Sequence, residues 1–310
     1  MYENLCEPLN VEKNIRLYAG SGNPELAQRI ADILHLPLSG LMLEKFANGE
    51  TYARFEETVR GCEVFFIQSL AGTNVNDLLM ETLIVSDAAT RASAASFTAV
   101  IPHYAYARSD KKDASRISLG GRLVADLLST AGVDRVITMA LHAPQVHGFF
   151  SVPVDHLTAL GVLAEHFRQR DLRNSVIVSP DLGNAKQATL LARKLGLPVA
   201  AGSKQRLADD RVVIESIVGD VAGKDAILLD DEIATAGSIV TLIEKLRDLE
   251  VKSLSVACTH GLFTGQAVER LNALDCVQDA LIGLLPRWDA VAAGNVDAYV
   301  RRSIVNASVS

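Results

Sequence analysis

The residues best suited to chemistry stand at the end of a short apolar run in the second half of the chain. Residues 226–229 are apolar, two aspartates follow, and a turn of small residues then opens a predicted helix. Ligands of open α/β sheets bind at the carboxyl ends of strands, and backbone N–H groups at a helix N-terminus bind anions. Adjacent carboxylates can accept hydrogen bonds from the vicinal hydroxyls of a sugar, directly or through a cation. The pattern therefore indicates a sugar-phosphate site made of Asp230, Asp231, Ala234, Thr235, Ala236, Gly237 and Ser238.

Each of these features also has a plainer interpretation. A hydroxyl-containing turn before a helix serves as a cap, and two acids at a strand end are often only solvated. The coincidence of the acid pair with the turn of small residues favours the sugar-phosphate site. Asp181, which follows another predicted strand, is open to the same two interpretations: it could hold Mg²⁺ through oxygen or cap the helix that begins near Ala185.

Short apolar runs alternate with segments of helical period along most of the chain. The predicted strands are residues 16–19, 64–68, 97–101, 135–139, 175–179, 225–229 and 254–258. The predicted helices are residues 24–34, 76–90, 119–131, 157–169, 185–195 and 238–249. This alternation predicts an α/β fold with parallel sheets flanked by helices. So many strands favour two domains, residues 1–155 and 156–310, with the boundary near residues 155–161.

Residues 230–238 resemble the phosphoribosyl-diphosphate loop that phosphoribosyltransferases and ribose-phosphate diphosphokinases share. Five further segments resemble the diphosphokinases in particular: residues 46–50, 104–113, 141–155, 178–181 and 259–261. This collinear series identifies the chain as a member of the ribose-phosphate diphosphokinase family. The resemblance implies two phosphoribosyltransferase-like domains, with ATP on the N-terminal one and ribose 5-phosphate on the C-terminal one.

The resemblance also implies a reaction and a set of roles. The diphosphate of Mg-ATP passes to the anomeric hydroxyl of ribose 5-phosphate, giving phosphoribosyl diphosphate and AMP, with Mg²⁺ as the cofactor. Lys204 and Arg206, on an expected loop, are the catalytic cations, because the transition state gains negative charge on its phosphate oxygens. His142 and Asp181 are the expected metal ligands. The expected ATP-binding residues are Phe46, Asn48, Glu50, Arg108, Ser109 and His142.

Composition restricts the partners. The formal net charge is −7 and no block of basic residues occurs, which argues against nucleic acid or a membrane surface as a partner. Cys6, Cys62, Cys258 and Cys276 form no C-x-x-C pair, and the first residues do not resemble a signal peptide. We therefore expect a cytoplasmic enzyme, and the family resemblance adds a homo-oligomer built from dimers, up to a hexamer.

Some positions depart from the family pattern. Ala140, Ser151 and Ala234 stand where acids are usual, and Asn184 stands where a glycine is usual. The family's C-terminal motif is shortened to residues 308–310, so we expect little activation by inorganic phosphate. These departures leave open a catalytically weak regulatory paralogue. A phosphoribosyltransferase is disfavoured because it has no use for residues 46–50 and 104–113, and no P-loop motif occurs.

Overall fold

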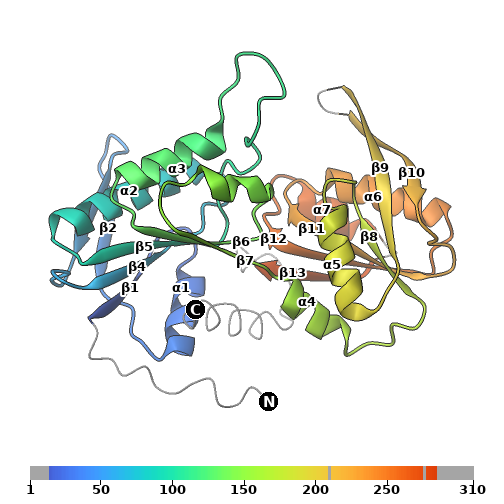
Figure 1. Ribbon diagram of the computed structural model, residues 1–310, viewed down its shortest axis with the longest axis horizontal. Helices are drawn as coiled ribbons and strands as arrows, with labels where there is room; N and C mark the ends of the chain where they lie inside the picture. The colour runs from blue at the N-terminus through green and yellow to red at the C-terminus, as the bar shows by residue number, and fades with distance from the viewer. Residues whose placement is uncertain (1–13, 209–210, 275–276, 285–310) are drawn as a thin grey trace. The chain divides into compact units, whose positions relative to one another are not determined.

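The computed structural model describes residues 14–208, 211–274 and 277–284, so the C-terminal motif at residues 308–310, Cys6 and Cys276 lie outside the described residues. The chain divides into two compact units between Leu157 and Thr158. Each unit is built on one mainly parallel sheet with helices packed against it (Figure 1). The predicted α/β fold class is confirmed.

The N-terminal unit has a five-stranded parallel sheet in the order β1-β4-β5-β6-β7. Helices α2 and α3 lie over one face of this sheet, and α1 lies against the other (Figure 1). The strands are β1 (Ile15–Ala19), β4 (Glu63–Ile67), β5 (Ser96–Ile101), β6 (Arg135–Met139) and β7 (Val154–Leu157). The helices are α1 (Pro24–Leu34), α2 (Val75–Arg91), α3 (Gly120–Thr130) and the 3₁₀ helix η1 (Pro144–Phe149).

An antiparallel hairpin that we did not predict, β2 (Leu41–Lys45) and β3 (Thr51–Phe55), packs on this unit. Leu41 and Leu43 from one strand pack against the buried core together with Ala53 and Phe55 from the other. The ring of Phe55 meets the buried ring of Tyr18 edge to face, with 4.8 Å between centroids. Alternate side chains therefore anchor the hairpin and leave its tip, residues 46–50, exposed.

The C-terminal unit has a six-stranded sheet in the order β10-β9-β8-β11-β12-β13, in which only β10 runs antiparallel to its neighbour. The strands are β8 (Ser175–Ser179), β9 (Val199–Ala208), β10 (Arg211–Val218), β11 (Asp225–Ile233), β12 (Ser253–Gly261) and β13 (Val277–Leu284). The helices are α4 (Leu160–Phe167), α5 (Ala185–Leu195), α6 (Gly237–Asp248) and α7 (Ala267–Asn272). None of the helices in the described part of the chain is both long and apolar enough to cross a membrane.

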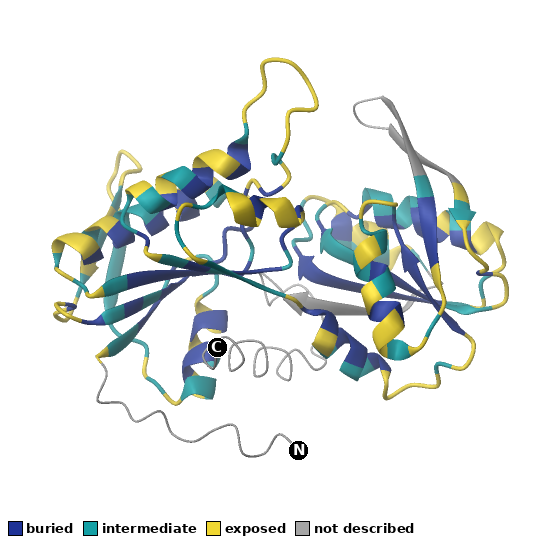
Figure 2. Cartoon of the chain, in the orientation of Figure 1, coloured by how far each residue is buried: buried dark blue, intermediate teal, exposed yellow. Residues whose placement is uncertain are grey.

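Two sequence-based predictions about elements were wrong. Lys204 and Arg206 lie on β9, whose backbone pairs with β10, and not on a loop. The helix predicted from residue 157 begins at Leu160, because Leu157 is the last residue of β7 and pairs with Met139. Buried residues follow the strands and the sheet-facing sides of the helices, whereas residues 111–118 are all exposed (Figure 2).

A buried polar cluster fixes the turn between β1 and α1. The Glu81 carboxylate accepts hydrogen bonds from the Ser21 N–H at 2.8 Å and from the Ser21 hydroxyl at 2.7 Å. The Gln68 amide donates to the same carboxylate at 2.6 Å and accepts from the Gly22 N–H at 2.8 Å. Glu81 and Gln68 are 6% and 0% exposed, so these bonds satisfy the two buried side chains, whereas Ser21 lies at the surface.

We expect Glu81→Ala to lower the free energy of unfolding by about 2–4 kcal/mol, because three hydrogen bonds are lost and the buried Gln68 amide is left without this acceptor. Urea unfolding followed by circular dichroism measures this loss. Asp87→Ala is the matched control, since Asp87 pairs with Arg91 on the exposed side of the same helix. That control should change the free energy by no more than about 0.5 kcal/mol. A loss below about 1 kcal/mol for Glu81→Ala would contradict this role.

Candidate functional site

Asp230 and Asp231 are part of strand β11 and do not follow it as a loop. We predicted that the strand ends at residue 229, but β11 continues to Ile233. Its pairing with β12 runs on through Asp230 opposite Cys258 and Glu232 opposite His260. The neighbouring strand thus holds the backbone of the acidic residues at the carboxyl end of the sheet, where ligands of such sheets bind.

The two aspartates interact with each other and with Asp181. The Asp231 N–H donates to the Asp230 carboxylate at 2.9 Å. Burial raises the pKa of Asp230 well above its usual range, and the negative charges of Asp231 and Asp181 raise it further. Two carboxylates on β11 and a third on the loop after β8 therefore interact electrostatically at this end of the C-terminal sheet, where a cation or a set of sugar hydroxyls would relieve their repulsion.

The turn that follows β11 leads directly into α6. Ala236 has a φ of 61°, in the left-handed region, and Gly237 is the first helical residue. The Thr264 N–H donates to the Ala234 carbonyl at 2.9 Å, and Arg270 Nη1 donates to the Thr235 carbonyl at 3.1 Å. Residues outside the turn thus donate to both carbonyls and hold the turn open at the N-terminus of α6. The N–H groups and the dipole of that helix end favour an anion.

Asp181 shares a short loop with the start of α5. Its Oδ1 accepts from the Asn184 N–H at 3.0 Å, and its carbonyl accepts from the Ser179 hydroxyl at 2.7 Å. The Asn184 side chain crosses to β11 and donates to the Leu229 carbonyl at 2.9 Å. Asp181 therefore fixes the backbone of the residue before α5 and adds its charge beside the acid pair. Its predicted part in holding Mg²⁺ stays a prediction.

Phe46, Asn48 and Glu50 form the tip of the β2–β3 hairpin in the N-terminal unit. The Phe46 N–H donates to the Glu50 carbonyl at 2.8 Å, and the Glu50 N–H donates to Asn48 Oδ1 at 3.2 Å. Gly49, with a φ of 88°, allows the turn. The Phe46 ring is 53% exposed and has only Tyr52 beside it, at 5.8 Å between centroids, among the ring contacts that the described residues make. Phe46 is not a core residue, and its face is accessible to a planar ligand.

The segment from Tyr104 to Ser109 is tied to α2 and α3. The buried Tyr104 hydroxyl donates to the Gly121 carbonyl at 3.0 Å. Tyr106, whose φ of 62° is in the left-handed region, donates from its hydroxyl to Asn76 Oδ1 at 2.5 Å. Between these anchored residues and the long exposed loop, Arg108 lies at the surface.

Ser109 has a structural task that its sequence position does not reveal. Its hydroxyl accepts from the Gly120 N–H at 3.0 Å and donates to the Ser118 carbonyl at 3.3 Å. Its carbonyl accepts from the Gly121 N–H at 3.1 Å. These bonds close the base of the loop at residues 110–119 and link it to the start of α3. Ser109 is thus a loop anchor beside Arg108.

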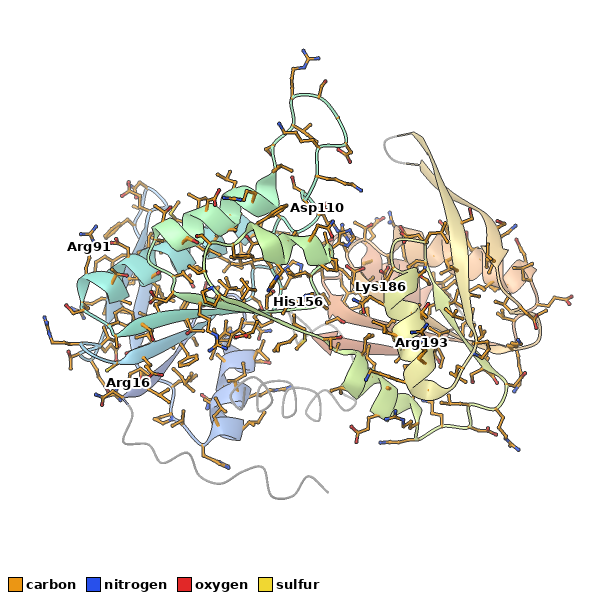
Figure 3. The ribbon with its side chains drawn as sticks, viewed as in Figure 1. Arg16, Arg91, Asp110, His156, Lys186 and Arg193 are labelled. Atoms are coloured by element: carbon orange, nitrogen blue, oxygen red, sulfur yellow. The ribbon has the colours of Figure 1, made fainter. Side chains whose placement is uncertain are left out.

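His142 is an exposed residue just after β6. The backbone before it turns sharply, with a φ of 43° at Ala140, and the Leu141 N–H donates to His156 Nε2 at 2.9 Å. His156, labelled in Figure 3, is on β7; burial lowers its pKa, and the nearby His147 lowers it further. The neutral ring required to accept this bond is therefore favoured, and it fixes the backbone beside His142.

The two units carry different parts of the predicted site. The hairpin tip, Arg108, Ser109 and His142 belong to the N-terminal unit, and the residues of the acid pair, the turn, Asp181 and β9 belong to the C-terminal unit. In the described part of the chain, no three His, Cys, Asp or Glu side chains converge to form a complete metal site. Sequence reasoning missed Asn184, Arg270 and His156 as partners of the site, because their contacts are long-range.

Two family models match the chain. The N-terminal domain of ribose phosphate pyrophosphokinase matches residues 15–132, and the phosphoribosyl synthetase-associated domain matches residues 213–283. Together they cover more than half of the sequence and include the hairpin tip, Arg108, the acid pair and the turn.

Individual relatives match over most of their length. A ribose-phosphate pyrophosphokinase of Deinococcus radiodurans is 49% identical over 266 residues, which are 85% of this chain and 83% of the relative. A ribose-phosphate pyrophosphokinase of Clostridium acetobutylicum is 45% identical over 280 residues, 90% of this chain and 88% of the relative. The crystal structure of phosphoribosylpyrophosphate synthetase from Mycobacterium smegmatis superposes with a TM-score of 0.86 at 38% identity, covering 96% of this chain and 99% of that one. The chain therefore belongs to the ribose-phosphate pyrophosphokinase family of enzymes.

Proposed function

We propose that this protein transfers the diphosphate of Mg-ATP to the anomeric hydroxyl of ribose 5-phosphate, giving phosphoribosyl diphosphate and AMP. The observation that carries the proposal is the continuous segment from Asp230 to Gly237, in which carboxylates inside the edge of the sheet lead into an open turn at a helix N-terminus. The carboxylates suit the sugar hydroxyls, and the turn suits the 5-phosphate.

In the C-terminal unit, Asp230 and Asp231 accept from the ribose hydroxyls. The backbone of Ala234, Ala236 and Gly237 and the hydroxyls of Thr235 and Ser238 surround the 5-phosphate. Thr235 is exposed at the turn, and Ser238 lies in the first turn of α6, so hydroxyl donors accompany the helix N–H groups. The phosphate fixes one end of the sugar and the acids fix the other, which orients the anomeric hydroxyl.

The donor set at this site fits Mg²⁺. Carboxylate oxygens are the ligands that Mg²⁺ prefers, and it commonly takes one or two of them together with substrate phosphates and water. Asp181 is the proposed protein ligand on the C-terminal unit, and His142 is its proposed counterpart on the N-terminal unit. A bound Mg²⁺ would neutralise negative charge on the phosphate oxygens of ATP.

In the N-terminal unit, the proposed adenine contact is the exposed face of Phe46, with Asn48 and Glu50 at the edge of the base. Arg108 neutralises the triphosphate, and Ser109 holds the backbone on which Arg108 is carried. Lys204 and Arg206 supply positive charge to the oxygens that become more negative during transfer. The attack of the sugar hydroxyl on the β-phosphorus is in line and needs no covalent intermediate with the protein.

We expect Phe46→Ala to raise the KM for ATP on the order of tenfold, the loss expected when a base no longer stacks on an aromatic ring. The KM for ribose 5-phosphate should stay within twofold, and Phe46→Tyr, which keeps the ring, should behave like the wild type. Met80→Ala is the matched control, because Met80 is 51% exposed on α2. Steady-state kinetics with both substrates varied provides the measurement; an unchanged KM for ATP would remove Phe46 from the nucleotide site.

The reaction type is tested by ³¹P NMR of the purified protein with Mg-ATP and ribose 5-phosphate. The proposal predicts AMP together with a diphosphate on the anomeric carbon. ADP together with a ribose bisphosphate would instead show transfer of a single phosphoryl group and would overturn the proposal. Release of diphosphate only when a nucleobase and preformed phosphoribosyl diphosphate are supplied would reveal a phosphoribosyltransferase.

A further inference from the structure

The segment that carries the acid pair and the turn is held near both of its ends by side chains from other elements. The Leu229 carbonyl, directly before Asp230, accepts from Asn184 Nδ2 at 2.9 Å. The Thr235 carbonyl, two residues before α6 begins, accepts from Arg270 Nη1 at 3.1 Å. The acid pair lies between these two anchors, and the backbone groups proposed to meet the 5-phosphate lie within two residues of the second anchor.

At the acid end, Asn184 connects the loop between β8 and α5 to strand β11. Strand β8 pairs with β11 only as far as Leu228, opposite Val178, so the strand-to-strand pairing stops one residue before the Asn184 contact. The side-chain amide of Asn184 continues the link between these elements, while its backbone N–H donates to the Asp181 carboxylate at 3.0 Å. One residue therefore fixes Asp181 relative to the strand that carries Asp230.

At the phosphate end, Arg270 reaches the turn from the short helix α7. Its Nη1 also lies 3.8 Å from where a Cβ on Gly237 would stand, so the guanidinium is beside the first residue of α6. The turn contains Ala236 in the left-handed conformation, which a non-glycine residue adopts only when its surroundings hold it there. Arg270 thus stabilises the carbonyl next to this residue and adds positive charge beside the proposed anion site.

We propose that Asn184 and Arg270 are positioning residues of the ribose-phosphate site: Asn184 aligns the acid end, and Arg270 aligns the phosphate turn. The inference rests on the proposed function, since it assigns these residues to the ribose 5-phosphate side of that reaction. It predicts that the two residues act on different ligands. Loss of Asn184 disturbs the carboxylates, and loss of Arg270 disturbs the turn.

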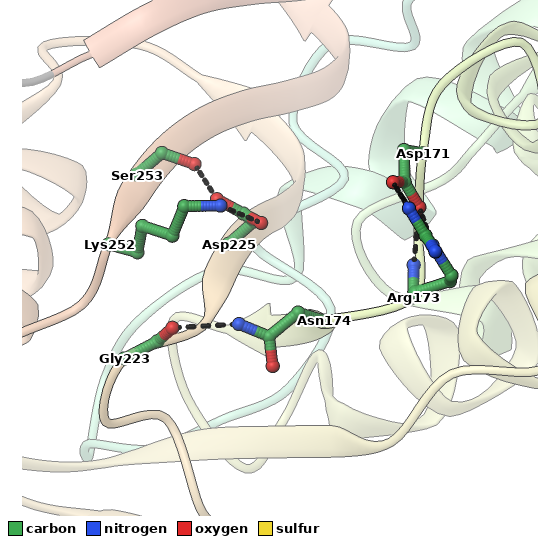
Figure 4. Close-up of polar contacts among 7 residues, drawn as sticks. All are labelled: Asp171, Arg173, Asn174, Gly223, Asp225, Lys252 and Ser253. Atoms are coloured by element: carbon green, nitrogen blue, oxygen red, sulfur yellow. Dashed lines mark hydrogen bonds and ion pairs between the residues drawn. The ribbon is translucent and has the colours of Figure 1, made fainter.

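For Asn184→Ala we expect the KM for ribose 5-phosphate and the Mg²⁺ concentration at half-maximal rate to rise about five- to tenfold, with kcat at saturation within about twofold. This is the effect of losing one side-chain hydrogen bond to the backbone. Asn174→Ala is the matched control. Asn174 Nδ2 donates to the Gly223 carbonyl at 2.8 Å, and the two residues lie just before the N-terminal ends of β8 and β11 (Figure 4). The control should lower the melting temperature by a similar amount and leave both kinetic constants unchanged.

For Arg270→Met we expect the KM for ribose 5-phosphate to rise about tenfold with the Mg²⁺ requirement and the KM for ATP unchanged, because a charge-assisted bond at the phosphate turn is lost. Arg270→Lys, which keeps the charge and one donor, should recover part of the affinity. Arg247→Met is the control, since Arg247 is an exposed arginine in the last turn of α6, at the other end of that helix.

Calorimetric titration of ribose 5-phosphate, with hydrogen exchange of residues 229–237, separates the possible failures. If the wild type does not bind ribose 5-phosphate, the proposed function fails and this inference fails with it. If the wild type binds it and both variants bind it equally well with unchanged exchange, only the inference is overturned. Weaker binding and faster exchange in the two variants, but not in Asn174→Ala or Arg247→Met, are the results that support it. Should Asn184→Ala not fold, Asn184→Asp removes the same donor while keeping the side-chain shape.

Discussion

Lys204→Ala is expected to lower turnover by on the order of 10²-fold or more, while the KM values for ATP and ribose 5-phosphate change less than about threefold. The reason is that negative charge grows on the bridging and equatorial phosphate oxygens only as the diphosphate leaves AMP. A cation that meets this charge stabilises the transition state more than the bound substrates. Its removal therefore acts on kcat and hardly on binding.

The measurement is the initial rate of AMP formation at saturating Mg-ATP and ribose 5-phosphate. Lys194→Ala provides the control, because Lys194 is an exposed lysine in the last turn of α5 and its loss changes the net charge equally. Lys204→Arg tests geometry, since it keeps the charge and alters the shape of the donor. A Lys204→Ala enzyme with normal turnover would remove this residue from the mechanism.

Asp231→Ala is expected to weaken ribose 5-phosphate binding on the order of 10- to 100-fold, because an ionised acceptor for the sugar hydroxyls is lost. Burial is the main cause of the raised pKa of Asp230, and the charge of Asp231 raises it further, so removal of Asp231 should lower that pKa only in part.

Titration calorimetry with ribose 5-phosphate measures this effect without requiring turnover. Asp231→Asn should lie between the wild type and Asp231→Ala, since it keeps the shape and one acceptor oxygen. Asp248→Ala, which removes a carboxylate at the far end of α6, is expected to bind normally. Equal affinities for the wild type and Asp231→Ala would refute the assignment of the acid pair to the sugar.

The elements that could be predicted are those with strong local signals. The helix at residues 24–34 begins with Asn23, whose side chain accepts from the Leu26 N–H at 3.0 Å, and with a proline at its first position. Gly196, with a φ of 71°, ends the helix at residues 185–195. Both helices have the predicted bounds, because capping residues act on the backbone beside them.

Elements that depend on distant partners escaped prediction. β11 was expected to stop at residue 229, where two aspartates follow, yet pairing with β12 carries it to Ile233. The β2–β3 hairpin exists because its alternate residues meet the core of the N-terminal unit, and the inward positions Thr51, Ala53 and Phe55 form a weak alternating pattern that could have indicated it.

The residues of the candidate site also fall into those that the sequence could predict and those that it could not. The acid pair and the following turn could be recognised because they are contiguous in sequence, and the resemblance that they supported is confirmed by the family match. The contacts of Asn184 and Arg270 could not be recognised from the sequence. Asn184 is 45 positions from its partner Leu229, and Arg270 is 35 positions from its partner Thr235. Only the fold brings these pairs together.

The most direct test of the central claim is AMP release from the purified protein with Mg-ATP, measured with and without ribose 5-phosphate. The proposed reaction predicts that AMP forms only when the sugar phosphate is present and in a one-to-one ratio with phosphoribosyl diphosphate. Binding of nucleotide and sugar phosphate with no AMP formed would contradict a diphosphate transferase and would point to a regulatory paralogue of the family.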